Sequence, residues 1–165
     1  MKYSIYKDKL IIEDIKDFNI EHILECGQIF TYKKNAEFDY DIYSWDKFAN
    51  VKKEDESYVV YTNSPEYFVN FFDLDTDYGA IKNELYKDEK MRNAIDYGYG
   101  IRILKQNIYE IIIGFILSAN NNIERIKGIM KKIRELGENK GNYYAFPTIE
   151  RLLKVTEQDY KNMGA

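Results

Sequence analysis

The sequence has few of the residues that form disulfides and bind metals. Its 165 residues include one cysteine, Cys26, and one histidine, His22. A single cysteine excludes an internal disulfide, which agrees with a reducing compartment. Cys26 has no evident base partner and is expected to be a packing residue. His22 stands apart from any Cys or His cluster and is expected at the surface or in a helix cap. We therefore predict no metal site and no cofactor.

Long hydrophobic runs are also missing. The longest, Ile111 to Leu117, is far shorter than the roughly 20 residues that a membrane span needs. Charges interrupt every apolar stretch near the N-terminus, so no cleavable signal is expected. We expect a soluble protein of the cytoplasm with no membrane partner. With 45% hydrophobic residues, the chain can bury a real core.

Paired-carboxylate, catalytic-triad and phosphate-loop signatures are absent, and two partial motifs are incomplete. The stretch "DLDTDYGAIKNE", residues 73–84, has the acidic spacing of a calcium loop. Its glycine, Gly79, stands at position seven instead of six, so Tyr78 would have to make the sharp turn. An acidic helix N-terminus is the favoured interpretation, and calcium the alternative. The stretch "GYGIRI" lacks the third glycine of a dinucleotide-binding motif.

The first part of the chain has the composition of strands. Its segments are rich in Tyr, Ile, Val and Phe and are separated by polar turns. The predicted strand segments are 3–15, 28–34, 39–48 and 57–63. A short helix is expected at Ile20–Glu25, and Ser64 followed by Pro65 predicts the start of another.

After Tyr97 the pattern is helical. Asn107 can cap the run "IYEIIIGFIL", residues 108–117, whose apolar character on most sides predicts a helix buried in a bundle. Apolar residues at spacings of three and four predict a second helix from Ile123, with Gly137 at its C-cap. Two shorter helices follow, and their expected caps are Thr148 and Thr156.

These patterns predict an α+β fold. We expect an antiparallel β-sheet domain over residues 1–97 and a partial α-helical domain over residues 98–165. No internal repeat or low-complexity linker separates them.

Charge is unevenly spread along the chain. The net charge is −4, yet residues 101–134 hold seven basic and two acidic residues, a local balance of +5. A polyanion responds to the local field within about a Debye length, roughly 10 Å. Nucleic-acid binding is therefore one interpretation, and a solvated helix face is the other. The seven basic residues are Arg102, Lys105, Arg125, Lys127, Lys131, Lys132 and Arg134.

Three consecutive asparagines, Asn120, Asn121 and Asn122, precede the second predicted helix. Asn121 or Asn122 can cap that helix, which accounts for one of the three. Short amides at a helix N-terminus can also meet phosphates and base edges when a basic face follows. A capped loop alone remains the alternative.

The stretch "GIRILKQNIYEIIIGFILSANNNIERIKGIMKKI" resembles the 8-oxoguanine DNA glycosylases, whose segment reads G-x-R-x-L-x-Q-x-x-x-E and then S-x-N-N-N-I-x-R-I. The resemblance includes "CGQIFTY", which matches the family's G-Q-x-F element, and "FFDLDTDYGAIKNEL" further along. Downstream it extends to "GNYYAFPTIERL" and "YKNMGA". It covers nearly the whole chain and is weakest over residues 33–62.

The resemblance implies a sheet domain like that of the TATA-binding protein and a base-excision repair function. Members of the family flip 8-oxoguanine, paired with cytosine, out of double-stranded DNA and cut its glycosidic bond. They use a lysine helped by an aspartate and then nick the strand by β-elimination. By resemblance, Asn120 is the wedge, Arg125 contacts the widowed cytosine, and the Gly27 carbonyl accepts from N7–H of the lesion. Asn121, Asn122, Lys127 and Lys131 complete the predicted DNA-binding set.

The family's helix-hairpin-helix, lysine nucleophile and catalytic aspartate correspond to positions after Ala165. We therefore expect this chain to be a fragment, with no catalytic residue and no glycosylase activity of its own. The helix at 108–117 would lack its packing partners, so self-association through its exposed face is expected. Two alternatives are a non-catalytic damaged-DNA-binding module and an alkylpurine DNA glycosylase of the same superfamily.

Overall fold

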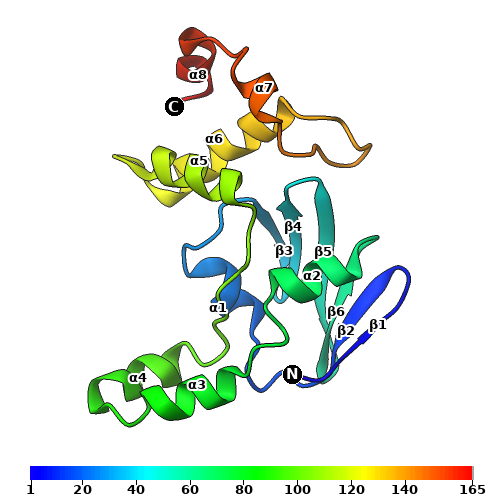
Figure 1. Cartoon of the computed structure of the whole chain (residues 1–165), viewed down its shortest axis with the longest axis vertical. Coiled ribbons are helices and arrows are strands. Elements are labelled where there is room, and N and C mark those ends of the chain that lie inside the picture. Colours follow the sequence, from blue (N-terminus) through cyan, green and yellow to red (C-terminus); the bar gives the residue numbers. More distant parts are fainter. Residues whose placement is uncertain (165) are drawn as a thin grey trace. The chain divides into compact units, whose positions relative to one another are not determined.

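The computed structural model describes residues 1–164, which form six strands and eight helices (Figure 1). The strands are β1 (Tyr3–Ile5), β2 (Lys9–Ile12), β3 (Tyr32–Ala36), β4 (Asp39–Ser44), β5 (Lys47–Glu54) and β6 (Ser57–Tyr61). The helices are α1 (Ile20–Glu25), α2 (Pro65–Phe71), α3 (Tyr78–Leu85), α4 (Glu89–Tyr97), α5 (Ile108–Ser118), α6 (Ile123–Glu135), α7 (Ile149–Leu152) and α8 (Glu157–Met163). The predicted α+β fold class is confirmed.

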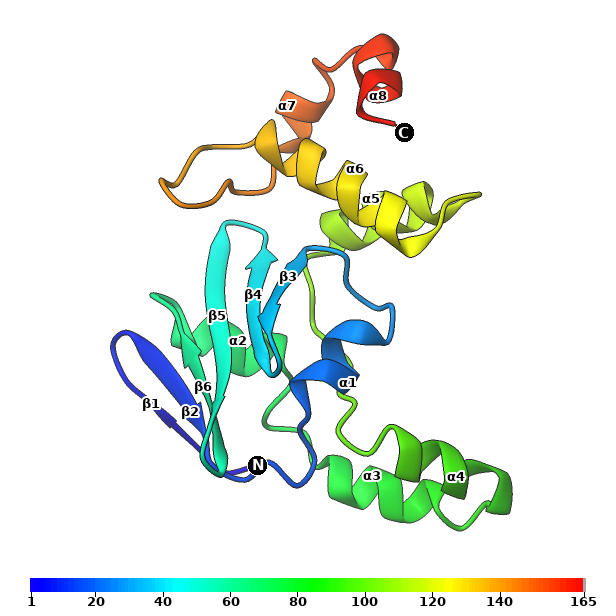
Figure 2. The ribbon, with the colours of Figure 1, turned by 180° about the vertical axis from the view of Figure 1, so that it is seen from behind.

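The six strands form one antiparallel sheet in the order β1-β2-β6-β5-β4-β3. Strand β6 pairs with β2 and with β5, so that Val60 lies opposite both Leu10 and Val51. All three side chains are fully buried. Successive side chains of a strand point to opposite faces, so this register places one apolar row on the same side of the sheet. Figure 2 shows the β1–β2 hairpin at the edge, beside β6.

The described chain divides into two compact units. Unit 1 contains residues 1–28, 34–41 and 49–105, and unit 2 contains residues 29–33, 42–48 and those from Gln106 onward. The start of β3, the end of β4 and the start of β5 therefore belong to unit 2. The domain boundary expected near residue 97 stays a prediction.

Unit 1 has an aromatic core. The ring of Phe18 lies 5.1 Å from that of Tyr58 and 5.3 Å from that of Phe72, and all three residues are buried. Helix α2 packs against β2 and β6 and contributes Phe68 and Phe71 to this core. Such tilted and edge-on ring pairs add to the stabilisation that comes from the buried area.

Several predicted strand segments have different limits in the structure. The segment predicted over 3–15 contains two strands, β1 and β2, which pair as a hairpin. The single strand predicted over 39–48 is wrong, because Trp45 turns the chain with a φ of 53° and separates β4 from β5. Strand β5 continues to Glu54. Residues 49–54 were not predicted as strand, because this stretch contains two lysines and an acidic residue. Strand β3 begins at Tyr32 instead of residue 28. Helix α4 was not predicted, although Asp88 at its N-cap and Gly98 at its C-cap are residue types typical of helix ends.

The N-cap predictions are confirmed. The side chains of Asn107, Asn122, Thr148 and Thr156 each accept a backbone N–H in the first turn of their helices. Ser64 occupies the N-cap position of α2, with Pro65 directly after it, although its side chain makes no capping bond.

Helix α6 ends with Leu136 as its C-cap, one position before the predicted cap, Gly137. A side chain at Gly137 would collide with the backbone, because a Cβ there would lie 1.8 Å from the Ala145 carbonyl oxygen. Close approach of two backbone segments therefore explains this glycine.

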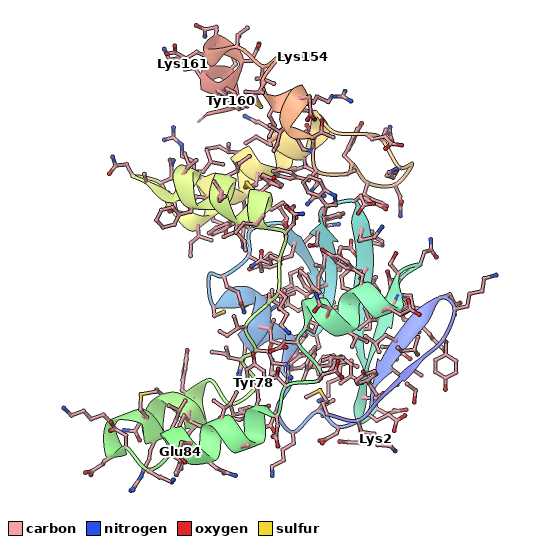
Figure 3. All side chains as sticks on the ribbon, viewed as in Figure 1. Lys2, Tyr78, Glu84, Lys154, Tyr160 and Lys161 are labelled. Carbon is pink, nitrogen blue, oxygen red and sulfur yellow. The ribbon has the colours of Figure 1, made fainter. Side chains whose placement is uncertain are left out.

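The acidic stretch before α3 acts as a helix N-terminus, as favoured from the sequence. Asp77 caps α3 by accepting from the Ala80 N–H. Asp73 is buried and accepts from the Thr76 and Tyr78 hydroxyls, and it pairs with Lys105 at 2.6 Å. Figure 3 labels Tyr78 at the start of this helix.

The expectations for His22 and Cys26 are corrected. Cys26 is exposed just after α1, so it is not a packing residue. His22 is half-buried within α1, where its Nδ1 accepts from the Gly100 N–H at 3.3 Å and its ring meets that of Tyr99 edge-on.

Unit 2 contains a smaller core between α5 and α6. Its buried members are Leu117, Ile126, Ile129, Met130, Ile133 and Phe146. The four residues from α6 recur at spacings of three and four, so they occupy one face of that helix. Gly114 faces Phe30, whose ring a Cβ would approach to 3.3 Å.

Helix α5 is not buried on all sides, which corrects the interpretation of its apolar sequence. Its buried residues are Glu110, Gly114 and Leu117. Phe115 is 78% exposed, Ile116 65% and Ile108 58%, and Ile111 and Ile112 are exposed as well. Within residues 1–164, only one face of this helix has a packing partner. No helix in this range is long and apolar enough to cross a membrane.

Candidate nucleic-acid interface

The three asparagines have three different structural situations. Asn122 is the N-cap of α6, and its side chain accepts from the Arg125 N–H at 2.9 Å. Asn121 donates to the Leu117 carbonyl at 2.8 Å and so closes the C-terminal end of α5. Local structure therefore explains two of the three asparagines, whereas the sequence alone explained only one.

Asn120 is the residue that local structure does not explain. Its side chain is exposed, and among residues 1–164 it has no hydrogen-bond partner. Its φ of 58° places it in the left-handed region, which asparagine tolerates better than most residues. The turn between α5 and α6 thus presents one short amide at its tip.

The basic residues of α6 lie on two different faces. Arg125 donates through Nε and Nη2 to the Gly164 carbonyl, at 3.3 and 3.0 Å, and Lys132 donates to the Met163 carbonyl at 3.0 Å. Lys127 and Lys131 line a groove elsewhere on the helix. At 3.6 residues per turn, they lie about 120° or more around the axis from Arg125. The predicted set therefore does not form a single basic face.

Arg102 and Arg134 do not contribute to the basic surface, which corrects the local charge balance of +5. Arg102 is fully buried, and its guanidinium donates to the backbone carbonyls of Asp17, Phe72, Asp73 and Thr76. Arg134 is 6% exposed. Lys105 belongs to unit 1 and pairs with Asp73. The basic residues that remain on α6 are Arg125, Lys127, Lys131 and Lys132.

Arg134 forms an ion pair with Glu110 in the interior of unit 2. The second carboxylate oxygen of Glu110 accepts from the Trp45 N–H at 2.6 Å. Burial raises the pKa of Glu110, while Arg134 and the Trp45 N–H oppose that rise because they favour the charged form. Sequence reasoning assigned no role to Glu110. Its position inside an apolar run indicated burial, and a buried carboxylate needs a partner, so the ion pair could have been expected.

Gly27 lies in unit 1, in the loop after α1. Its φ is 89°, a conformation that favours glycine, and no atom lies within 4 Å of where a Cβ would stand. A side chain here would therefore project into open space. The residues predicted to act on DNA belong to both units, Gly27 to unit 1 and the asparagines and α6 to unit 2.

Gln28 holds the loop that carries Gly27, a role that sequence reasoning missed. Its Nε2 donates to the carbonyls of Ile23 and Arg102, both at 2.8 Å. Its Oε1 accepts from the Leu104 N–H at 2.9 Å. The loop is thus tied to the end of α1 and to the extended segment around the buried Arg102.

Comparison with known proteins identifies the family. The family model of the 8-oxoguanine DNA glycosylase N-terminal domain matches residues 10–112, more than half of the chain. The chain belongs to the 8-oxoguanine DNA glycosylase family. The resemblance inferred from the sequence motifs is therefore confirmed.

Curated relatives of this glycosylase family member include two eukaryotic enzymes. The N-glycosylase/DNA lyase OGG1 of Arabidopsis thaliana is 31% identical over 83 residues, which are 47% of this chain and 23% of that protein. The N-glycosylase/DNA lyase of Saccharomyces cerevisiae is 40% identical over 75 residues, 39% of this chain and 19% of that protein.

Solved structures match over nearly the whole chain. The 8-oxoguanine glycosylase/lyase of Clostridium acetobutylicum in its apo-form is 36% identical with a TM-score of 0.87 and is matched over 98% of this chain. The same protein in complex with double-stranded DNA containing cytosine opposite 8-oxoG is 37% identical with a TM-score of 0.88. MBOgg1 in complex with a low-affinity DNA ligand is 33% identical with a TM-score of 0.89. The chain spans 60%, 59% and 61% of the lengths of these three protein chains.

Proposed function

We propose that this chain is part of an 8-oxoguanine DNA N-glycosylase with lyase activity, which excises oxidised guanine opposite cytosine from double-stranded DNA. Membership of the family supports this proposal, as does the similarity to a glycosylase/lyase solved with such a duplex. The single observation that carries it is the state of Asn120, an exposed amide in a left-handed turn with no structural task in the described part of the chain.

Asn120 is the proposed wedge. A base that leaves the stack costs a few kcal/mol of lost stacking and pairing, so a side chain must fill the vacated space. The amide of Asn120 is short and is held at the tip of a turn whose two sides are fixed by Asn121 and Asn122. These two residues act on DNA through the turn they hold, and the backbone N–H of Asn122, at the N-terminus of α6, can meet a phosphate.

Arg125 is the proposed contact of the widowed cytosine, and Lys127 and Lys131 are proposed to meet phosphates. The side chain of Arg125 is exposed, and within residues 1–164 its guanidinium donates to the Gly164 carbonyl alone, so one acceptor must be exchanged when DNA binds. A guanidinium donates from several nitrogens in a fixed plane, which suits an acceptor-bearing base edge.

Gly27 is the proposed reader of the lesion. Its carbonyl would accept from N7–H of 8-oxoguanine, whereas normal guanine presents an acceptor at N7 and would be repelled. A mismatch of this kind is worth roughly 1 to 3 kcal/mol. The hydrogen bonds of Gln28 support this role, because a carbonyl that discriminates must have a fixed direction.

We also propose that the 165-residue chain alone has no glycosylase activity and that the activity belongs to the longest natural reading frame that contains it. The partial coverage of the solved relatives supports this part. An excision assay tests it with a duplex that holds 8-oxoguanine opposite cytosine. We expect the longer protein to release the base and this chain not to do so. Preferential binding without release by the longer protein would favour the damaged-DNA-binding module, and release of alkylated purines would favour the alkylpurine branch.

The exposed apolar face of α5 is the proposed site of self-association for this chain. Phe115 and Ile116 lie next to each other on it and are the most exposed of its large apolar side chains. Replacing Phe115 with aspartate should abolish association measured by light scattering. A chain that is already monomeric at high concentration would contradict this proposal.

A further inference from the structure

Unit 2 contains a groove along α6 that is separate from Asn120 and Arg125. Its volume is about 520 Å³, within the range of roughly 300 to 1,000 Å³ that is usual for ligand sites. One wall is formed by α6 and the other by residues of the segments 30–33 and 142–144. All its lining residues belong to the same unit.

The groove combines positive charge with aromatic rings. Lys33 reaches it from β3, and Lys131 from α6. Both lysines are exposed, and within residues 1–164 neither forms an ion pair. Tyr143 and Tyr144 contribute rings from the opposite wall. Charged donors beside ring faces are the features that bind a phosphate with an attached base.

Part of the groove is already arranged by contacts within the unit. The ammonium group of Lys127 lies 4.4 Å from the centre of the Tyr32 ring and 3.2 Å from Glu124. Partial burial lowers the pKa of Lys127, but the Tyr32 hydroxyl and Glu124 outweigh this effect and raise it. The Tyr143 ring stacks on Phe48, with centroids 5.5 Å apart, and its hydroxyl donates to the Asp46 carbonyl. These rings are thus held in place before any ligand enters.

Gly128 leaves the groove open on the helix side. A Cβ there would meet no atom within 4 Å, and its backbone does not require a glycine. Glycine is unfavourable inside a helix, so a glycine at this exposed position of α6 is not explained by stability. The space it leaves lies between Lys127 and Lys131, which are one position before and three positions after it.

We infer that this groove binds a nucleotide, with its phosphate on Lys33 and Lys131 and its base against the tyrosine rings. The chemistry fits a free mononucleotide and equally a nucleotide of a single DNA strand. Glu135 also lines the groove, and its negative charge opposes the binding of an anion. Removing that charge should therefore strengthen nucleotide binding, the opposite of the effect expected when a lysine is removed. Lys131 is also a proposed phosphate contact of the duplex, whereas Lys33, Tyr143 and Tyr144 have no role in the proposed glycosylase function.

Calorimetric titration of the 165-residue chain and of its longest natural reading frame tests the inference. The probes are deoxyguanosine monophosphate, deoxyguanosine, inorganic phosphate and a short single-stranded oligonucleotide. We expect binding of the monophosphate or of the oligonucleotide, and which of the two binds identifies the source of the nucleotide. Deoxyguanosine and inorganic phosphate should each bind more weakly. Phosphate alone binding as tightly as the nucleotide would overturn the role of the tyrosine rings.

Three variants localise the binding. Lys131→Ala and Lys33→Ala should each weaken it about fivefold, and Glu135→Gln should tighten it. The matched control is Lys154→Ala, because Lys154 is an exposed lysine of the same unit outside the groove (Figure 3).

Gly128→Leu keeps the proposal testable if a lysine variant fails to fold. Leucine favours a helix more than glycine does, so the variant should fold at least as well while its side chain fills the groove. Loss of binding in a folded Gly128→Leu protein is the expected result. Binding that is unchanged in this variant and in both lysine variants, or no binding of any nucleotide probe, would overturn the inference.

Discussion

The carboxylate of Glu110 and the guanidinium of Arg134 form a buried ion pair that joins α5 to α6. Their side chains are 5% and 7% exposed. Arg134 also donates to the carbonyls of Trp45 and Tyr144, at 2.8 and 3.1 Å. One charged pair therefore connects both helices with the turn between β4 and β5 and with the segment before Phe146, all within unit 2.

Removing one member of this pair should strongly destabilise the chain. Glu110→Gln and Arg134→Met each leave the other group buried without its charge partner, at a cost of about 3 to 5 kcal/mol. The double variant should cost clearly less than the two single costs combined, because it removes both charges. Urea unfolding of the four proteins measures this. Additive costs would show that the pair is not coupled, and Glu138→Gln, which breaks an exposed pair with Lys140, should change stability little.

Asp73 should make the stability of unit 1 depend on acid pH. The pKa of its carboxyl is lowered: burial opposes the shift, but bonds from Lys105, Thr76 and Tyr78 outweigh it. A lowered pKa means that the stabilisation is complete above the unfolded value, about 3.9, and is lost as the pH falls through the lower folded value. Asp73→Asn should therefore be less stable than the wild type at pH 7, with a smaller difference at pH 3. Thermal unfolding at the two pH values measures this, and an equal difference at both would contradict the assignment.

Substitutions of Asn120 and Asn122 should have different effects, one on DNA and the other on stability. Asn122→Ala removes the N-cap of α6 and should cost about 1 kcal/mol of stability. Asn120→Gly retains the left-handed turn and should leave stability nearly unchanged, while it reduces base opening in a duplex that contains 8-oxoguanine. Fluorescence of 2-aminopurine beside the lesion reports that opening. An unchanged signal with Asn120→Gly would remove the wedge from the proposal.

Arg125 and Lys131 should contribute to weak, salt-sensitive duplex binding. Arg125→Ala and Lys131→Ala should each weaken binding at low salt, and the loss of the proposed phosphate contact of Lys131 should reduce the slope of log K against log salt by about one. A salt titration of the wild type, the two variants and the Lys154→Ala control measures both effects. Arg125 and Lys131 lie on different faces of α6, so a loss with Arg125→Ala alone would place the duplex on the face that holds Arg125.

The sequence predicted the elements with strong local signals. Helix α1 has the predicted bounds, and the caps at Asn107, Asn122, Thr148 and Thr156 are made by the predicted side chains. Such signals are short-range, because a cap bonds to backbone within its own first turn.

Features that depend on distant contacts were not predictable in this way. Trp45 turns the chain in the middle of a strand-like stretch, and only the pairing of β4 with β5 determines its position. Arg102 and Arg134 were counted as surface charge because a sequence does not show whether a basic side chain meets a buried carboxylate or a set of carbonyls. Helical periodicity alone separates Lys127 and Lys131 from Arg125, but it does not show that Gly164 lies beside Arg125 or that the 142–144 segment lines a groove with the two lysines.

Borohydride trapping tests the central claim most directly. A Schiff base between a lysine and the sugar is reduced to a stable bond, so a covalent band reports the lyase chemistry itself. The substrate is a duplex with 8-oxoguanine opposite cytosine, and the two proteins are this chain and its longest natural reading frame. We expect a covalent band from the longer protein and none from the 165-residue chain. No band from the longer protein, or any band from the 165-residue chain, would contradict the account.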